Sequence, residues 1–170
     1  MFQKGDYIVY GSSGVCKVEE IGPMDLTGST KGKLYYTLSP VYSNKSRIYT
    51  PVDNAKIVMR SVLSKEEAMV LIEKIPEIEP LWVNDEKKRE ELYQQRIKTC
   101  SFVEWIKIIK TLYLRRKSRM DNGKQLASVD ERYLKIAEDS LYGELAIALG
   151  MEREEVEPFI CDHINALALV

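Results

Sequence analysis

The chain has 170 residues, of which 45% are hydrophobic and 30% are charged, with a formal net charge of −1. This composition is typical of a globular protein of one or two domains, and no apolar run reaches the roughly 18 residues of a membrane span. The N-terminus has no apolar core of a secretory signal. The three cysteines lie far apart, which argues against a disulfide framework or a metal site and favours a reducing cytoplasm.

The first 60 residues are predicted to form a small β module. β-branched and aromatic residues alternate with turn-forming Gly, Pro and Asn, a pattern typical of short strands joined by tight turns. The predicted strands are residues 6–10, 15–21, 34–38, 47–50 and 55–59. Pro51 should end the fourth strand or place it at a sheet edge. Five such strands favour a strongly bent sheet or a partly open barrel.

From Ser64 onward the hydrophobic period changes to that of helices. Ser-x-x-Glu capping boxes at Ser64, Ser101 and Ser128 predict three helix starts, and Asn84 is a reasonable N-cap for another. These helices should end near residues 75, 120, 149 and 98, respectively, and a last one should begin near residue 152 with Pro158 inside it. The predicted fold class is therefore α+β, with domains 1–60 and 61–170 and four or five helices in the second.

The near-zero net charge hides three blocks of different sign. Residues 1–82 are neutral, with ten Lys and Arg and ten Asp and Glu. Residues 83–125 carry twelve basic and six acidic residues, a net charge of about +6, and residues 126–170 have three against ten, about −7. The middle block is the predicted electrostatic footprint.

Two basic clusters stand out in that block. One is Lys87, Lys88 and Arg89, and the other is Arg115, Arg116, Lys117 and Arg119. Both could be ordinary solvated helix faces, and acidic neighbours of the first cluster offer i,i+4 pairs. The second cluster has no acidic residue close in sequence before Asp121. It therefore favours contact with the phosphates of a nucleic acid.

The two tryptophans are expected to play different roles. Trp105 lies next to Ile106 within a predicted helix, which indicates a core position. Trp82 follows Pro80 in a short connector before a basic helix, where an indole is harder to bury. It could be a core residue or could wedge against an unstacked base or a minor-groove step.

No catalytic pattern is present. His163 is the only histidine and lies in an apolar helix, where a packing or surface role is expected. The glycines lack dinucleotide-binding or P-loop spacing, so no cofactor is expected. A pair of carboxylates could still come together in three dimensions, but the chain is predicted not to be an enzyme.

Three motifs resemble those of the CarD/CdnL family of bacterial transcription regulators. They are Gly5-Asp6-Tyr7-Ile8-Val9-Tyr10 with Gly14-Val15 and Val18, Pro51-Val52-Asp53-Asn54-Ala55, and Glu79-Pro80-x-Trp82. The first module also resembles the polymerase-interaction domain of transcription-repair coupling factors, but no ATPase machinery follows it. Some relatives have basic residues where this chain has Tyr49, Asn84 and Asp85.

The resemblance implies a Tudor-like N-terminal module that binds the β subunit of RNA polymerase. The implied contact strand comprises Arg47, Ile48, Tyr49, Thr50 and Pro51. The C-terminal helices would lie on promoter DNA at the upstream edge of the melted −10 region, with basic residues on the phosphate backbone. Trp82 would enter the minor groove and stabilise the open complex.

The resemblance also implies a monomer in the cytoplasm, associated with the nucleoid through polymerase. It assigns DNA contacts to Trp82, Lys87, Arg115 and Arg116, and the two basic clusters add Lys88, Arg89, Lys117 and Arg119 as expected contacts. An alternative is an adaptor of the transcription machinery that binds proteins and never touches DNA.

Overall fold

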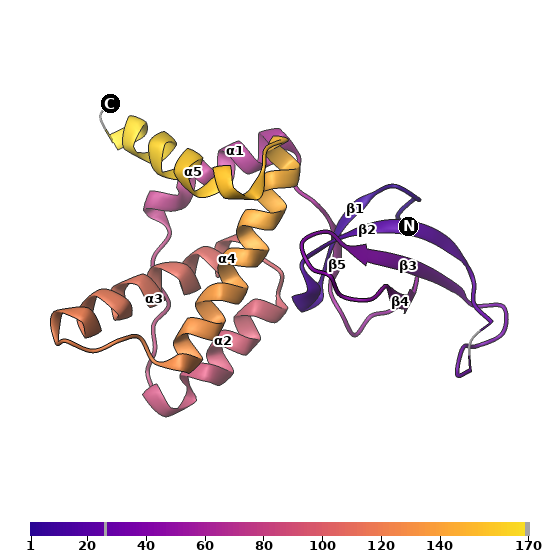
Figure 1. The fold of residues 1–170 in the computed structure, drawn as a ribbon, viewed down its shortest axis with the longest axis horizontal. Helices are drawn as coiled ribbons and strands as arrows, with labels where there is room; N and C mark the ends of the chain where they lie inside the picture. The colour runs from indigo at the N-terminus through magenta and orange to yellow at the C-terminus, as the bar shows by residue number, and fades with distance from the viewer. Residues whose placement is uncertain (26, 169–170) are drawn as a thin grey trace. The chain divides into compact units, whose positions relative to one another are not determined.

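The computed structural model describes residues 1–25 and 27–168 (Figure 1). The chain forms two compact units, Met1–Val62 and Leu63–Val170. In the part of the chain that the structure describes, the first unit consists of β-strands and short turns, and the second consists of helices and loops. The predicted α+β class is therefore confirmed.

The first unit is a five-stranded antiparallel sheet that does not close into a barrel. Its strands are β1 (Tyr7–Tyr10), β2 (Val15–Pro23), β3 (Leu34–Pro40), β4 (Ile48–Pro51) and β5 (Met59–Ser61). They lie in the order β4-β3-β2-β1-β5, so β4 and β5 are the two edges. A register shift between Val18 and Glu20 marks a β-bulge, which adds local twist to the long β2–β3 pair.

One face of the sheet holds the core of this unit. Ile8, Val18, Tyr36 and Leu38 are at most 1% exposed and pack into one hydrophobic cluster. They come from alternating positions of three neighbouring strands, as expected for a sheet with one buried face.

The predicted fifth strand at residues 55–59 is wrong except at its last residue. The Asn54 side chain accepts the backbone N–H of Lys56 at 2.9 Å and also donates to Thr50 Oγ1 at 2.9 Å. This local turn occupies the backbone after β4, and pairing with β1 begins only at Met59. Asn side chains commonly compete with strand pairing in this way.

Five α-helices are described in the second unit, up to residue 168. They are α1 (Lys65–Lys74), α2 (Arg89–Lys98), α3 (Phe102–Asp121), α4 (Ser128–Leu149) and α5 (Arg153–Ala168). Short 3₁₀ turns, η2 (Ile75–Glu77) and η3 (Glu86–Lys88), flank the connector between α1 and α2. No helix in the described ranges is long and apolar enough to cross a membrane.

Helix ends match the predictions only in part. The Ser64–Glu67 capping box is present, and Gly150 ends α4 in the left-handed conformation, with φ of 66°. The boxes predicted at Ser101 and Ser128 do not form. The Glu104 carboxylate, which should complete the box at Ser101, forms ion pairs with Arg96 and Lys107 instead.

Large side chains from the long helices fill the core of this unit. Trp105, Ile108 and Leu112 of α3 and Leu141 and Leu145 of α4 are all at most 1% exposed, and the two helices pack against each other. The predicted core position of Trp105 is confirmed. Pro158 lies inside α5, which starts at Arg153.

Candidate nucleic-acid and protein interfaces

Trp82 lies on the surface of the helical unit. Its side chain is 82% exposed, more than that of any other aromatic residue in the described ranges. The indole N–H donates to Asn84 Oδ1. The prediction that Asn84 caps the next helix is therefore wrong. Asp85 caps the 3₁₀ turn η3 by accepting the N–H of Lys87 at 3.0 Å, and α2 begins at Arg89 with no side-chain cap.

The connector that carries Trp82 is fastened to α3. Lys110 Nζ donates to the carbonyl oxygens of Ile75 and Ile78, the second at 2.7 Å. The Leu81 N–H donates to Thr111 Oγ1 at 2.8 Å. Burial lowers the pKa of Lys110, although the nearby charge of Glu79 acts in the opposite direction.

The first basic cluster divides into exposed and paired residues. Lys87 and Lys88 are exposed in η3, and neither forms an ion pair with any residue that the structure describes. Arg89, at the start of α2, is only partly exposed, and its Nε lies 3.0 Å from Asp130 Oδ1. Only the two lysines therefore offer a freely solvated charge.

Arg115 of the second cluster is also engaged within the unit. Its Nε lies 3.3 Å from Asp130 Oδ2, and its Nη1 lies 2.8 Å from Glu86 Oε2. Asp130 is fully buried, so the two arginines that face it supply the charge it needs. Burial acts to lower the pKa of Arg115, but the Glu86 hydrogen bond and the Asp130 charge raise it overall.

The rest of the second cluster is more accessible. Lys117 is exposed. The Arg116 guanidinium lies 6.0 Å from the centre of the Tyr113 ring, at the limit of a cation–π contact, and Arg119 Nε donates to the Gln125 carbonyl at 2.5 Å. Lys117 and the outer part of Arg116 thus extend the solvated charge along the last two turns of α3.

Sequence reasoning missed the residues that hold this site together. Thr111 meets Leu81 across 30 positions of sequence, and Asp130 meets Arg89 across 41. Neither contact belongs to a local motif, so no spacing pattern could reveal it. Leu114, which is 58% exposed on an otherwise core-forming helix, was also missed.

The predicted polymerase-contact strand is an edge of the sheet. β4 pairs only with β3, which leaves its other side available for an added strand. Arg47 is exposed, Tyr49 is 47% exposed, and Ile48 and Pro51 are half-buried. Thr50 is 1% exposed and accepts from Asn54, so its side chain faces the core.

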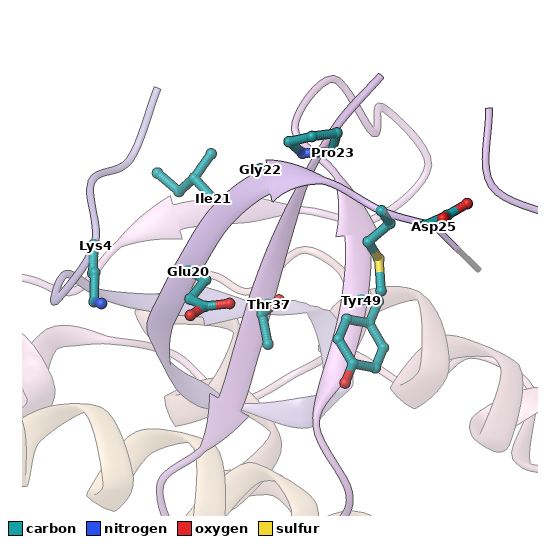
Figure 2. A pocket seen from close by; sticks show the side chains of 9 residues that line it. Lys4, Glu20, Ile21, Gly22, Pro23, Asp25, Thr37 and Tyr49 are labelled. Atoms are coloured by element: carbon teal, nitrogen blue, oxygen red, sulfur yellow. The ribbon is translucent and has the colours of Figure 1, made fainter. Parts of the chain in front are cut away.

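The outer face of the sheet next to this edge is hollowed. Glu20, Thr37 and Tyr49 occupy one row across β2, β3 and β4, and Figure 2 shows them on neighbouring strands. They line an open cavity of about 600 Å³ together with Lys4, Ile21, Gly22, Pro23, Met24 and Asp25. Its mixed polar and apolar wall suits a protein surface better than a small apolar ligand.

No cluster of potential metal ligands occurs within residues 1–25 and 27–168. Cys16 and Cys100 are buried and Cys161 is exposed, and none of these three cysteines forms a disulfide. His163 stacks on Phe159 with ring centres 5.9 Å apart, and its Nε2 lies 3.7 Å from Glu73 Oε1. It is a partly exposed packing residue, as the sequence indicated.

Comparison with known protein families gives two matches that together span most of the chain. Residues 2–63 match the CarD-like/TRCF RID domain, and residues 82–161 match the CarD C-terminal domain. No curated protein matches the chain. The first match corresponds to the β unit, and the second begins at Trp82 and runs into α5.

Proposed function

Since the chain belongs to the CarD/CdnL family of RNA polymerase-interacting transcription regulators, we propose that it binds the polymerase β subunit and stabilises promoter open complexes. The β unit would bind the polymerase through β4, and the helical unit would contact promoter DNA through Trp82. The family is one of non-enzymatic regulators, and we propose that this chain likewise catalyses no reaction. It would act as a monomer in the cytoplasm, on the nucleoid.

The exposed indole of Trp82 is the observation that carries this proposal. Burying an aromatic side chain that is 82% exposed lowers the free energy of the complex, because it removes on the order of 150 Å² of surface from water. In the minor groove, an apolar wedge between base steps is stabilised in this way. Lys87, Lys88, Arg116 and Lys117 would contact the flanking phosphates.

The decisive experiment compares Trp82→Ala and Trp82→Phe with the wild-type protein in open-complex lifetime assays. The alanine variant should shorten the lifetime and retain polymerase binding, and the phenylalanine variant should keep part of the effect. An alanine variant with an unchanged lifetime would rule out the wedge.

The polymerase contact has a separate test. Alanine at both Arg47 and Tyr49 should weaken binding to the isolated β lobe, because both residues are exposed in or next to the edge strand β4. Lys45→Ala, an exposed position in the preceding loop, is the matched control. Undiminished binding of the double variant would remove β4 from the interface.

The alternative is an adaptor that never touches DNA. It is favoured by the internal pairing of Arg89 and Arg115, which reduces the charge available to phosphates. Salt titrations of the association with polymerase, with and without promoter fragments, separate the two functions, because only direct DNA contact adds salt dependence when the promoter is present.

A further inference from the structure

The segment that carries Trp82, residues 81–86, is fixed to α3 at its first residue. The Leu81 N–H donates to Thr111 Oγ1 at 2.8 Å, and the same hydroxyl donates to the Lys107 carbonyl at 2.7 Å. Thr111 is only 7% exposed, so water competes little for this pair. The backbone immediately before the indole is therefore held by a buried side chain.

The last residue of the segment is fixed to the same helix. Both carboxylate oxygens of Glu86 accept from Arg115 Nη1, at 3.1 and 2.8 Å. Arg115 is itself oriented by the fully buried Asp130, through Nε at 3.3 Å. One guanidinium thus joins a surface loop to the interior of the unit, a geometry that its planar fork allows and a lysine cannot reproduce.

The two anchors are neighbours on α3. Thr111 and Arg115 are four residues apart, so they lie on one face of the helix about one turn apart. Segment 81–86, which these anchors hold at its two ends, is short. The Asn84 side chain further restricts the indole by accepting its N–H. An exposed aromatic ring is thereby attached to a backbone with little freedom.

We propose that Thr111 and Arg115 are positioning residues that hold segment 81–86 so that the Trp82 indole is preorganised for its partner. The inference rests on the proposed contact between Trp82 and promoter DNA. It assigns Arg115 an internal role rather than a phosphate contact. Preorganisation strengthens binding because less conformational entropy is lost when the ring enters the groove.

The test uses Thr111→Val, which keeps the side-chain shape, and Arg115→Lys, which keeps the charge. Indole ¹⁵N relaxation reports the mobility of Trp82 in the free protein, and the buried Trp105 indole serves as the internal reference. Arg132→Lys is the matched control, because Arg132 also pairs with a surface carboxylate, that of Glu90, instead of with the segment.

Both test variants should increase the mobility of the Trp82 indole and leave that of Trp105 unchanged. Each should shorten the open-complex lifetime about fivefold, the equivalent of the net contribution of one hydrogen bond. In a Trp82→Ala background neither should shorten it further. The control should leave the indole unchanged.

An indole as rigid as in the wild type in both variants would overturn the proposal. A loosened indole with an undiminished lifetime, in a system where Trp82→Ala shortens it, would also overturn it. If Trp82→Ala itself has no effect on the lifetime, the proposed function fails, and the relaxation data alone still decide whether Thr111 and Arg115 hold segment 81–86.

Discussion

At the scale of single residues, the two tryptophans should contribute very differently to stability. Trp82→Ala should change the free energy of unfolding by less than ~0.5 kcal/mol, because the ring is 82% exposed. Trp105→Ala should lower it by about 3–5 kcal/mol, because the ring is 1% exposed and its loss leaves a cavity. Urea denaturation of the two variants measures both values. Comparable losses would show that Trp82 packs in solution.

The buried and the exposed cysteines should also differ in ionisation and in reactivity. Burial raises the pKa of the Cys16 thiol from 9.0 to about 11. In the unfolded chain this thiol ionises near its ordinary value of 9.0, so its contribution to stability is complete below pH 9 and is lost as the pH rises through 11.

Wild-type protein should therefore lose up to about 3 kcal/mol more than Cys16→Ala between pH 8 and 12, measured by denaturation at each pH. Parallel pH profiles of the two proteins would contradict this.

At pH 8, thiol reagents should modify the exposed Cys161 much faster than the buried Cys16.

Single residues were predictable where one local interaction was available to them and not where several nearby groups competed for the same side chain. The burial of Trp105 followed from its apolar neighbours in one helix. Asn84 and Glu104 were misassigned, because each could cap a nearby helix by spacing alone. In the fold, Asn84 accepts the indole N–H of Trp82 instead. Glu104 forms ion pairs with Arg96 and Lys107.

At the scale of helices, the buried carboxylate of Asp130 ties α4 to α2 and α3. Asp130→Asn should destabilise the protein by about 3–5 kcal/mol, because Arg89 and Arg115 then lose their buried counter-charge. The matched control is Glu86→Gln, which changes an Arg115 partner whose side chain is 61% exposed and should cost less than ~1 kcal/mol. Equal losses of stability in thermal or urea denaturation would mean that the buried Asp130 carboxylate contributes no more to stability than the exposed Glu86 carboxylate.

The helices themselves were predictable, because hydrophobic periodicity fixes their faces and Ser64 and Gly150 mark two of their ends. Strands were predictable except the fifth, where the Asn54 turn delays pairing until Met59. The contacts that join helices could not be predicted, because they depend on residues brought together by the fold.

At the scale of the whole molecule, the basic block should make promoter binding depend on salt. Lys87→Ala and Lys117→Ala should each lower the slope of log affinity against log salt by about 1, because each removes one phosphate contact. Lys31→Ala, an exposed lysine of the β unit, should leave the slope unchanged. Titrations of polymerase–promoter complexes at several salt concentrations measure this. Unchanged slopes in all three variants would favour the adaptor.

The α+β organisation was predictable at this scale because the hydrophobic period changes once, at Ser64. The function could not be predicted from the residues alone, because a basic block and an exposed indole can bind either nucleic acid or protein. The resemblance to a family supplied RNA polymerase as the partner.

The narrow borders of the sheet have a consequence for self-association. β4 has four residues and ends at Pro51, which has no N–H to donate, and β5 has three residues. Long flat borders recruit identical borders from other molecules and nucleate fibrils. Borders this short give a second copy too few ladder hydrogen bonds to hold it, so concentrated solutions should stay monodisperse. A partner that binds at β4 must then add side-chain contacts of its own, which makes the strand selective as well as available.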